Sequence, residues 1–386
     1  MDIASLRREF PVLQHCIYLN CGTYGPLPTA VADELIRWYR RIEMEGSFAP
    51  EVLQDLHEEY EAARRAAAAL LHADPEEIAL TRNVSEGVNI VANGLSWQPG
   101  DEVILTDEEH PGGACPWLNL ARREGIVVKL LPLANDVQVI LERLEELITS
   151  RTRLVYVSHV SCQSGLRLPV AEICDLAHRK GALVMVDGAH SVGQFPVDVR
   201  SLRCDFYAAC GHKWICGPQG TGFLYIRREH LSDVEPIFVG WDTPMHFDLQ
   251  GLAFEPRPDA RRFEYSTRPW PLYPALRVAL ERILALDPAE IERAIIPMAI
   301  ALKGALIDIP GVKLISPWDP SLSSGLVAFT HTIPGDLGQR LWEEHRILVG
   351  ANKDRRWVRI SVNAYISSEE LDLLVCVLRQ LAEEAR

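Results

Sequence analysis

Apolar and polar stretches alternate over the first 230 residues in a pattern that is typical of strands followed by helices. The predicted strands are short, nearly continuous apolar runs, and the segments between them repeat apolar residues at helical spacing. Strands are expected at 77–81, 102–106, 127–133, 153–160, 182–188, 205–210 and 220–227, and helices at 53–71, 85–95, 116–123, 140–149 and 170–180. Strands without polar alternation belong to a sheet that helices cover on both faces. The order of elements therefore predicts a three-layer α/β/α fold with a mostly parallel sheet and right-handed crossovers.

The pattern changes after residue 227. Residues 240–274 are rich in proline, glycine and aromatic side chains and are expected to form a loop. Further along, helices are expected at 273–286, 290–307, 337–345 and 368–384, with strands at 326–330 and 357–361. We therefore predict a large domain over 18–260 and a smaller α+β domain made of 1–17 and 261–386.

Composition excludes several classes of function. The 386 residues are 48% hydrophobic and 24% charged, which is enough for a folded protein of about two domains. The net charge of −14, without a block of Lys or Arg, argues against binding to nucleic acid. Nine cysteines without a CxxC pair argue against a disulfide framework or a zinc knuckle and favour a reducing, cytoplasmic location. The sequence suggests neither a signal peptide nor a membrane span, so we expect no membrane association.

Polar side chains lie at or just after the ends of four of the predicted strands, 102–106, 153–160, 182–188 and 205–210. They are His110, then His159 and Gln163, then Asp187 and His190, and last His212 and Lys213. Ligands of parallel α/β sheets bind beyond the carboxyl ends of the strands. The pattern therefore indicates a functional site at this edge of the sheet.

Two of these positions, Asp187 and Lys213, and also Ser85 carry a specific chemical expectation. Asp187 directly follows a buried run, so its carboxylate needs a cationic partner, although it could instead cap a helix. Lys213 follows another buried strand. An amine in apolar surroundings readily loses its proton and forms Schiff bases, although Lys213 could instead be a solvated loop lysine. Ser85, with the backbone N–H groups of Glu86 and Gly87, could hold a phosphate at a helix N-terminus or could be a plain N-cap.

A resemblance makes these expectations sharper. Residues 186–227 contain Asp-x-x-His at 187–190 and Gly-His-Lys-Trp at 211–214. This segment resembles the core of the class V aminotransferase family, whose members are fold-type I enzymes that use pyridoxal 5′-phosphate (PLP). Further similar segments lie at 18–28, 81–89, 100–112 and 261–271, so the resemblance covers most of the chain up to residue 275.

The resemblance implies a role for each candidate residue. Lys213 would form the Schiff base and move the substrate α-proton, and Asp187 would pair with the pyridine nitrogen. His110 would stack on the ring, and His190 would reach the ring hydroxyl oxygen. The phosphate would be bound by Ser85, the backbone of Glu86 and His212. Thr267 would contact the phosphate in a neighbouring subunit, which implies a homodimer with a shared active site. Arg359 would clamp the substrate carboxylate, and either Gln163 or Cys162 would lie beside the cofactor.

Other interpretations of the same residues stay open. His110 could be an ordinary loop histidine, and Arg359 could lie on the surface of its strand. His110, His159, His190 and His212 could form a metal site with Asp187. We expect no metal, because no pair of these residues has the i, i+4 spacing of ligands on a helix and Lys213 would have no role.

The family includes cysteine desulfurases, carbon–sulfur lyases, kynureninases, epimerases and transaminases. Desulfurases need a mobile cysteine shortly before the carboxylate-binding arginine, and residues 347–361 contain none. These residues also have Val349 and Gly350 where desulfurases tend to have an arginine. Residues 100–112, 238–244 and 261–267 resemble the branch of cysteine/cystine lyases and isopenicillin-N-epimerase-like enzymes.

We therefore expect a β-eliminating carbon–sulfur lyase that acts on cysteine- or cystine-type substrates and gives pyruvate and ammonia. The alternatives within the family are an amino-acid epimerase and an enzyme like the class V aminotransferases or cysteine desulfurases. The alternatives from other classes are a metal-dependent hydrolase and a non-catalytic binding protein.

Overall fold

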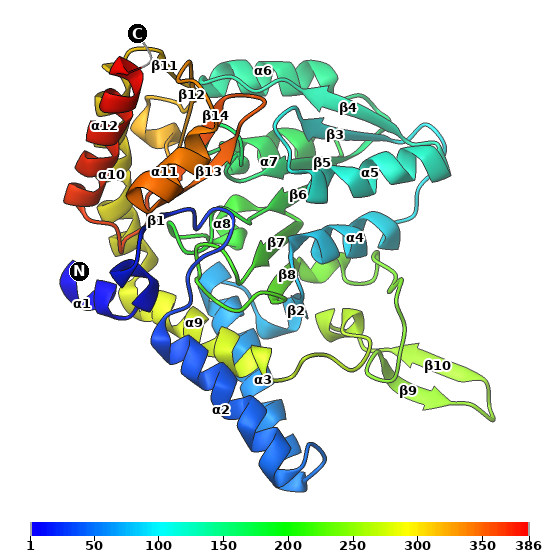
Figure 1. Ribbon diagram of the computed structural model, residues 1–386. Helices are drawn as coiled ribbons and strands as arrows, with labels where there is room; N and C mark the ends of the chain where they lie inside the picture. Colours follow the sequence, from blue (N-terminus) through cyan, green and yellow to red (C-terminus); the bar gives the residue numbers. More distant parts are fainter. Residues whose placement is uncertain (1, 385–386) are drawn as a thin grey trace.

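The computed structural model describes residues 2–384, which form two sheets surrounded by helices (Figure 1). The larger sheet has seven strands, in the order β2 (Ile78–Thr81), β8 (Gly222–Ile226), β7 (Phe206–Cys210), β6 (Leu183–Asp187), β5 (Thr152–Ser158), β3 (Glu102–Thr106) and β4 (Val127–Leu131). The five strands from β7 to β4 are parallel, and β8 is antiparallel to both of its neighbours. The predicted α/β fold with a mostly parallel sheet is thereby confirmed.

Both faces of the larger sheet are apolar because successive strand residues point into different helical layers. In β5, Leu154 and Tyr156 pack with α4 (Val84–Gly94) and α5 (Pro111–Glu124). Val155 and Val157 belong instead to the core shared with the helices of the opposite layer, α3 (Pro50–Leu71), α6 (Val137–Leu147), α7 (Val170–Arg179) and α8 (Val199–Leu202). Double coverage explains why these strands are continuous apolar runs in the sequence.

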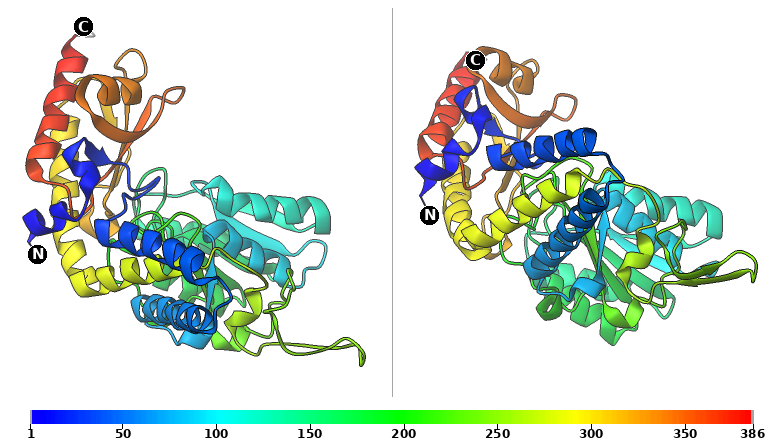
Figure 2. Two further views of the ribbon diagram at one scale, coloured as in Figure 1. Left: turned by 60° about the horizontal axis from the view of Figure 1, so that its bottom comes forward. Right: turned by 90° about the horizontal axis from the view of Figure 1, so that it is seen from below.

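The smaller sheet combines the beginning and the end of the chain. Its order is β1 (Ile17–Leu19), β13 (Ile347–Asn352), β14 (Trp357–Ser361), β12 (Leu326–His331) and β11 (Val312–Leu314). Around it lie α10 (Pro288–Ile307), α11 (Leu337–His345) and α12 (Ser368–Glu383), with the short α1 (Ile3–Arg8) nearby (Figures 1 and 2). β1 places residues 17–19 in this sheet, although the predicted domain division gives residue 18 onward to the larger domain.

Helices from distant parts of the chain pack together. α9 (Leu272–Leu286) packs against both α2 (Thr29–Glu45) and α3. Within residues 2–384, no helix is long and apolar enough to cross a membrane.

Residues 240–274 do not form the featureless loop that the sequence pattern predicts. They contain an antiparallel hairpin of β9 (Pro244–Asp248) and β10 (Ala253–Pro256), which extends away from the rest of the chain (Figures 1 and 2). Its apolar side chains are exposed, among them Met245, Phe247 and Leu252. The strands are too short to show an alternation of apolar and polar residues. The proline at the outer end of each strand is typical of a turn, so the sequence pattern indicates a loop.

A buried ion pair joins α3 to the start of the segment that leads into α9. Arg64 is fully buried, and its Nη1 and Nη2 atoms lie 2.5 and 2.9 Å from the carboxylate oxygens of Glu264. Glu264 also accepts hydrogen bonds from the Leu80 backbone N–H and the Tyr60 hydroxyl. One carboxylate therefore links a helix, a strand and a loop.

Replacing Glu264 by alanine is expected to lower the free energy of unfolding by about 3 kcal/mol, because it leaves the buried Arg64 with Glu61 as its remaining acidic partner. Urea denaturation followed by circular dichroism measures the change. The exposed pair Arg293–Glu290 is the matched control, and Glu290→Ala should cost less than about 1 kcal/mol. Equal losses for the two variants would contradict the proposed importance of the buried pair.

Candidate active site

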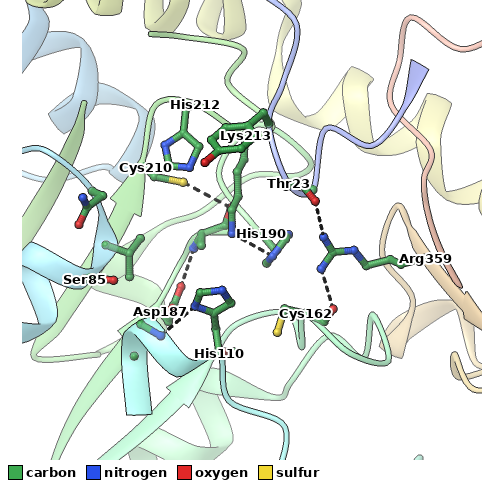
Figure 3. A pocket seen from close by; sticks show the side chains of 18 residues that line it. Thr23, Ser85, His110, Cys162, Asp187, His190, Cys210, His212, Lys213 and Arg359 are labelled. Carbon is green, nitrogen blue, oxygen red and sulfur yellow. Dashed lines mark hydrogen bonds between the residues drawn. The ribbon is translucent and has the colours of Figure 1, made fainter. Parts of the chain in front are cut away.

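A cavity of about 240 Å³ lies at the carboxyl ends of β5, β6 and β7 (Figure 3). The N-termini of α4 and α5 also face it, and β14 of the smaller sheet contributes Arg359. Of the residues predicted for the site, it brings together Lys213, Asp187, His110, Ser85, His190, His212, Arg359 and Cys162. Residues from six separate segments of the chain therefore converge on one space.

Asp187 is a buried carboxylate at the end of β6, with a relative exposure of 5%. Its Oδ2 accepts a hydrogen bond from the Tyr156 hydroxyl at 3.0 Å, and its Oδ1 accepts one from the Ala189 N–H at 2.8 Å. Both donors are neutral, so a cationic group in the cavity would stabilise the carboxylate. No helix begins in the residues that follow, since α8 starts at Val199 and is capped by Asp198, so the alternative of a helix cap is wrong.

Gly113 leaves the space that Tyr156 needs to reach Asp187. A Cβ atom added to Gly113 would lie 1.9 Å from the Tyr156 hydroxyl oxygen. Any larger residue in place of Gly113 would displace the tyrosine ring. Tyr156 was missed as a functional residue because it sits inside an apolar strand, although a buried tyrosine hydroxyl in such a run needs a partner.

Lys213 and His190 form a hydrogen-bonded pair in the cavity, with the Lys213 Nζ 3.1 Å from the His190 Nε2. The indole N–H of Trp214 donates to the Nδ1 atom of His190, so Nδ1 carries no proton. Burial, together with the nearby Lys213, holds the pKa of His190 well below its usual value, so the ring is neutral and its proton is on Nε2. The Nε2 atom of His190 therefore faces the Lys213 amine in the cavity. A primary amine is the group that condenses with an aldehyde.

One end of the cavity is suited to an anion. The first residues of α4 and α5 line it, and the free N–H groups of a helix N-terminus favour negative charge. Ser85 and Gly112 face each other there, since a Cβ on Gly112 would lie 2.4 Å from the serine hydroxyl oxygen. The buried Nδ1 of His212 has no hydrogen-bond partner within residues 2–384, and burial lowers the pKa of this ring to about 4.

Three of the predicted cofactor contacts lie outside the cavity. The Glu86 N–H donates to the side chain of Asn83, the N-cap of α4, so it is not free for a phosphate. The carboxylate of Glu86 pairs with Arg82. The Gln163 side chain faces Arg355, and only its neighbour Cys162 lines the cavity. Thr267 is exposed in the loop before α9, and its predicted contact with a neighbouring subunit stays a prediction.

Arg359 is buried at the cavity edge, with a relative exposure of 8%, so the alternative of a surface arginine is wrong. Its Nη1 donates to the Cys162 carbonyl at 2.7 Å and its Nη2 to the Thr23 hydroxyl at 3.1 Å. Its Nε is buried without a hydrogen-bond partner in the described chain. Burial lowers the pKa of this guanidinium, and an anion in the cavity would offset that cost.

Of the histidines predicted for the site, His110 lines the cavity and His159 does not. His110 caps α5 by accepting the Gly112 N–H at 3.0 Å, and burial lowers the pKa of its ring. His159 is turned away, because its Nδ1 bonds the Tyr207 hydroxyl and its ring packs on Phe195. Among the residues that the structure describes, no three His, Cys, Asp or Glu side chains are arranged to hold a metal ion.

Comparisons with known proteins agree with this geometry. The family model "Aminotransferase class-V" matches residues 17–374. The chain belongs to the class V aminotransferase family. Membership identifies it as a PLP-dependent enzyme, as the resemblance in the sequence predicts.

Individual relatives of this class V enzyme have different activities. An isopenicillin N epimerase of Streptomyces clavuligerus is 34% identical over 95% of either chain. A probable cysteine desulfurase of Methanothermobacter thermautotrophicus is 30% identical over 99% of this chain and 98% of its own. The solved complex of the cystine C–S lyase C-DES with its product cysteine persulfide has a TM-score of 0.89 and 32% identity, over 96% of this chain and 99% of that one.

The cavity fits PLP by the chemistry of its side chains. Asp187 offers a carboxylate without a cationic partner in the described chain, Lys213 offers a primary amine, and the two helix N-termini with His212 form an anion site. These are the groups that a pyridinium nitrogen, an aldehyde and a phosphate require. They would hold the cofactor, and Arg359 would remain available for the substrate.

Proposed function

We propose that this PLP-dependent enzyme is a β-eliminating carbon–sulfur lyase for cysteine- or cystine-type amino acids. The observation that carries the proposal is the state of the cavity's two thiols. Cys162 and Cys210 both line the cavity, and burial raises the pKa of each to about 11. A thiol must be a thiolate to attack a substrate sulfur, so neither is suited to accept it as a persulfide.

The cavity's own residues can carry out an elimination. Bound PLP supplies an electron sink that weakens the bonds at the Cα atom of an amino acid. Arg359 binds and orients the substrate carboxylate, and the Lys213 amine takes the proton from Cα. The carbon–sulfur bond at Cβ then breaks. With cystine and one water, the products are cysteine persulfide, pyruvate and ammonia. The relation to the C–S lyase C-DES supports this choice.

The proposal is tested by incubating the purified holoenzyme with L-cystine, L-cysteine and S-substituted cysteine sulfoxides. We expect pyruvate and ammonia in equal amounts from at least one of them, measured with coupled dehydrogenase assays. Formation of alanine together with protein-bound sulfur would show a desulfurase and contradict the proposal.

Epimerisation is a second candidate, favoured by the similarity to isopenicillin N epimerase and by the position of Cys162. An epimerase needs a second proton donor on the face of the substrate opposite the lysine. Figure 3 shows Lys213 and Cys162 on opposite sides of the cavity, and the thiol is protonated at neutral pH. Incorporation of deuterium at Cα in heavy water, without pyruvate, would favour this activity over elimination.

We also propose that the enzyme works as a cytoplasmic homodimer. The exposed apolar side chains around the hairpin, including Phe238, Trp241 and Phe247, offer a surface for a second copy. The exposed Thr267 is available for the neighbouring active site that the family resemblance implies. All nine cysteines are free, which suits a reducing compartment.

A further inference from the structure

The three acidic residues after β3 have three different partners. The carboxylate of Asp107 accepts the Leu133 N–H in an exposed turn. The carboxylate of Glu109 accepts the hydroxyls of Thr106 and Ser158, both at 2.6 Å, behind the cavity. Glu108 instead reaches across to the loop at 161–165, which follows β5. Its role is not explained by the cofactor or by the chemistry proposed above.

Glu108 holds the end of this loop that carries Cys162. Its Oε2 atom accepts hydrogen bonds from the Ser161 hydroxyl and from the Ser164 hydroxyl, the second at 2.5 Å. Ser161 Oγ in turn accepts the N–H groups of Gln163 and Ser164, each at 3.1 Å. Both serines are buried, so without Glu108 their hydroxyls would lose the carboxylate that accepts from them. The Cys162 thiol also lies 3.8 Å from the Glu108 carbonyl.

The other end of the loop is fixed by the smaller sheet. The Ser316 hydroxyl donates to the Ser164 carbonyl at 2.5 Å, and the Ser324 hydroxyl donates to the Gly165 carbonyl at 2.7 Å. The Trp357 indole N–H also donates to the Gln163 carbonyl at 3.1 Å. These bonds hold residues 163 to 165, whereas on the Ser161 side of Cys162 the loop is held by the Glu108 carboxylate.

The Cys162 carbonyl is one of the two hydrogen-bond acceptors of the Arg359 guanidinium, which also lies over the Trp357 ring. The other is the Thr23 hydroxyl, and Nε has no partner in residues 2–384. A shift of the loop would therefore break the hydrogen bond from Nη1 of Arg359 to the Cys162 carbonyl, and the guanidinium would be left with a single hydrogen bond within residues 2–384. An arginine recognises a carboxylate through two parallel hydrogen bonds, so its orientation decides how well it binds.

We propose that Glu108 is a positioning residue for the substrate carboxylate, which acts by holding the 161–165 loop so that the Cys162 carbonyl orients Arg359. This inference rests on the proposed role of Arg359 in binding substrate. Glu108 itself does not contact the substrate. It connects the segment that carries His110 to the arginine of the smaller sheet.

The test compares Glu108→Ala and Glu108→Gln with Asp107→Ala, which removes a neighbouring carboxylate that does not touch the loop. With L-cystine as substrate, Glu108→Ala should raise KM roughly tenfold and change kcat less than about threefold. Glu108→Gln keeps a side-chain oxygen for the serine hydroxyls and should restore KM to within about threefold. Asp107→Ala should behave as the unmodified enzyme.

Cystamine separates positioning from general damage, because it is cystine without its carboxylates. Its inhibition constant against L-cystine should be the same in Glu108→Ala and in the unmodified enzyme. Equal weakening of cystamine and cystine would show a merely structural role and overturn the inference. If Glu108→Ala does not fold, Ser164→Ala, which removes one of the two donors, should still raise KM for cystine, and an unchanged KM would overturn it.

Hydrogen–deuterium exchange of the substrate-free holoenzyme tests the loop independently of the reaction. Peptides that contain residues 161–165 should exchange faster in Glu108→Ala than in Asp107→Ala. If none of L-cystine, L-cysteine and the cysteine sulfoxides gives pyruvate, the proposed function fails, while faster exchange in the loop still supports Glu108 as its anchor. Unchanged exchange overturns the inference whatever the substrate is.

Discussion

Lys213→Ala is expected to abolish turnover, with a fall in kcat/KM of roughly 10³-fold or more. The reason is that the Lys213 amine lies 3.1 Å from His190 Nε2 and faces the cavity that contains Asp187. No second lysine lines this cavity in the described part of the chain. The unmodified protein should be yellow, and borohydride should bleach it and fix the cofactor on the peptide that contains Lys213. The alanine variant should give no such labelled peptide.

Lys303 is the matched control for this experiment. It is also buried, its Nζ donates to the Pro317 carbonyl and the Ser323 hydroxyl, and burial lowers its pKa to about 8. Its amine therefore has the reactivity that Schiff-base formation needs, but it lies outside the cavity. Lys303→Met should keep the colour, the activity and the label at Lys213. A label at Lys303, or full activity of Lys213→Ala, would remove Lys213 from its proposed role.

The larger sheet could be predicted from the sequence because its determinants are local. Each strand is apolar on both sides, and the following helix shows its own period, so strand and helix are specified within a few residues of each other. β1 and β13 were not predicted. β1 is three residues long, and its pairing with β13 joins the two ends of the chain, which no local pattern reports.

The site was predictable to the extent that it depends on the ends of the strands. Asp187 and Lys213 each follow a buried strand, so their meeting in one cavity follows from the parallel topology. Arg359 comes from the other sheet, and only the family resemblance pointed to it. The backbone N–H of Glu86 was predicted to bind the phosphate, but it donates to Asn83, the N-cap of the helix. Residue spacing alone does not show which of several neighbouring polar residues caps a helix.

Tyr156 and Glu108 show a different limit of sequence analysis. Each acts through a partner on a separate element, Asp187 for the tyrosine and the serines of the 161–165 loop for the glutamate. Their functional meaning depends on side-chain geometry across strands. In the sequence they are a tyrosine in an apolar run and one acid among three.

Asp187→Asn is expected to lower kcat by roughly 10²–10³-fold while the fold is kept, because it removes a charge without changing the shape of the side chain. The asparagine oxygen can still accept the Ala189 N–H, and its amide can donate to the Tyr156 hydroxyl oxygen, so both existing hydrogen bonds have a replacement. What is lost is the negative charge that would hold a proton on the pyridine nitrogen of PLP. We also expect weaker cofactor binding, measured by titrating the apoenzyme with PLP.

Tyr156→Phe separates the charge of Asp187 from its orientation. This variant removes the hydrogen bond to Oδ2 and keeps the carboxylate, so kcat should fall by only about tenfold, the effect of one hydrogen bond to a charged group. Circular dichroism should be the same for both variants and the unmodified protein. The absorbance of bound PLP should change more in Asp187→Asn than in Tyr156→Phe, since only the former alters the protonation of the ring. If Asp187→Asn instead kept kcat within a few fold, the carboxylate would be a structural acceptor for Tyr156 and Ala189, and the ring nitrogen would need another partner.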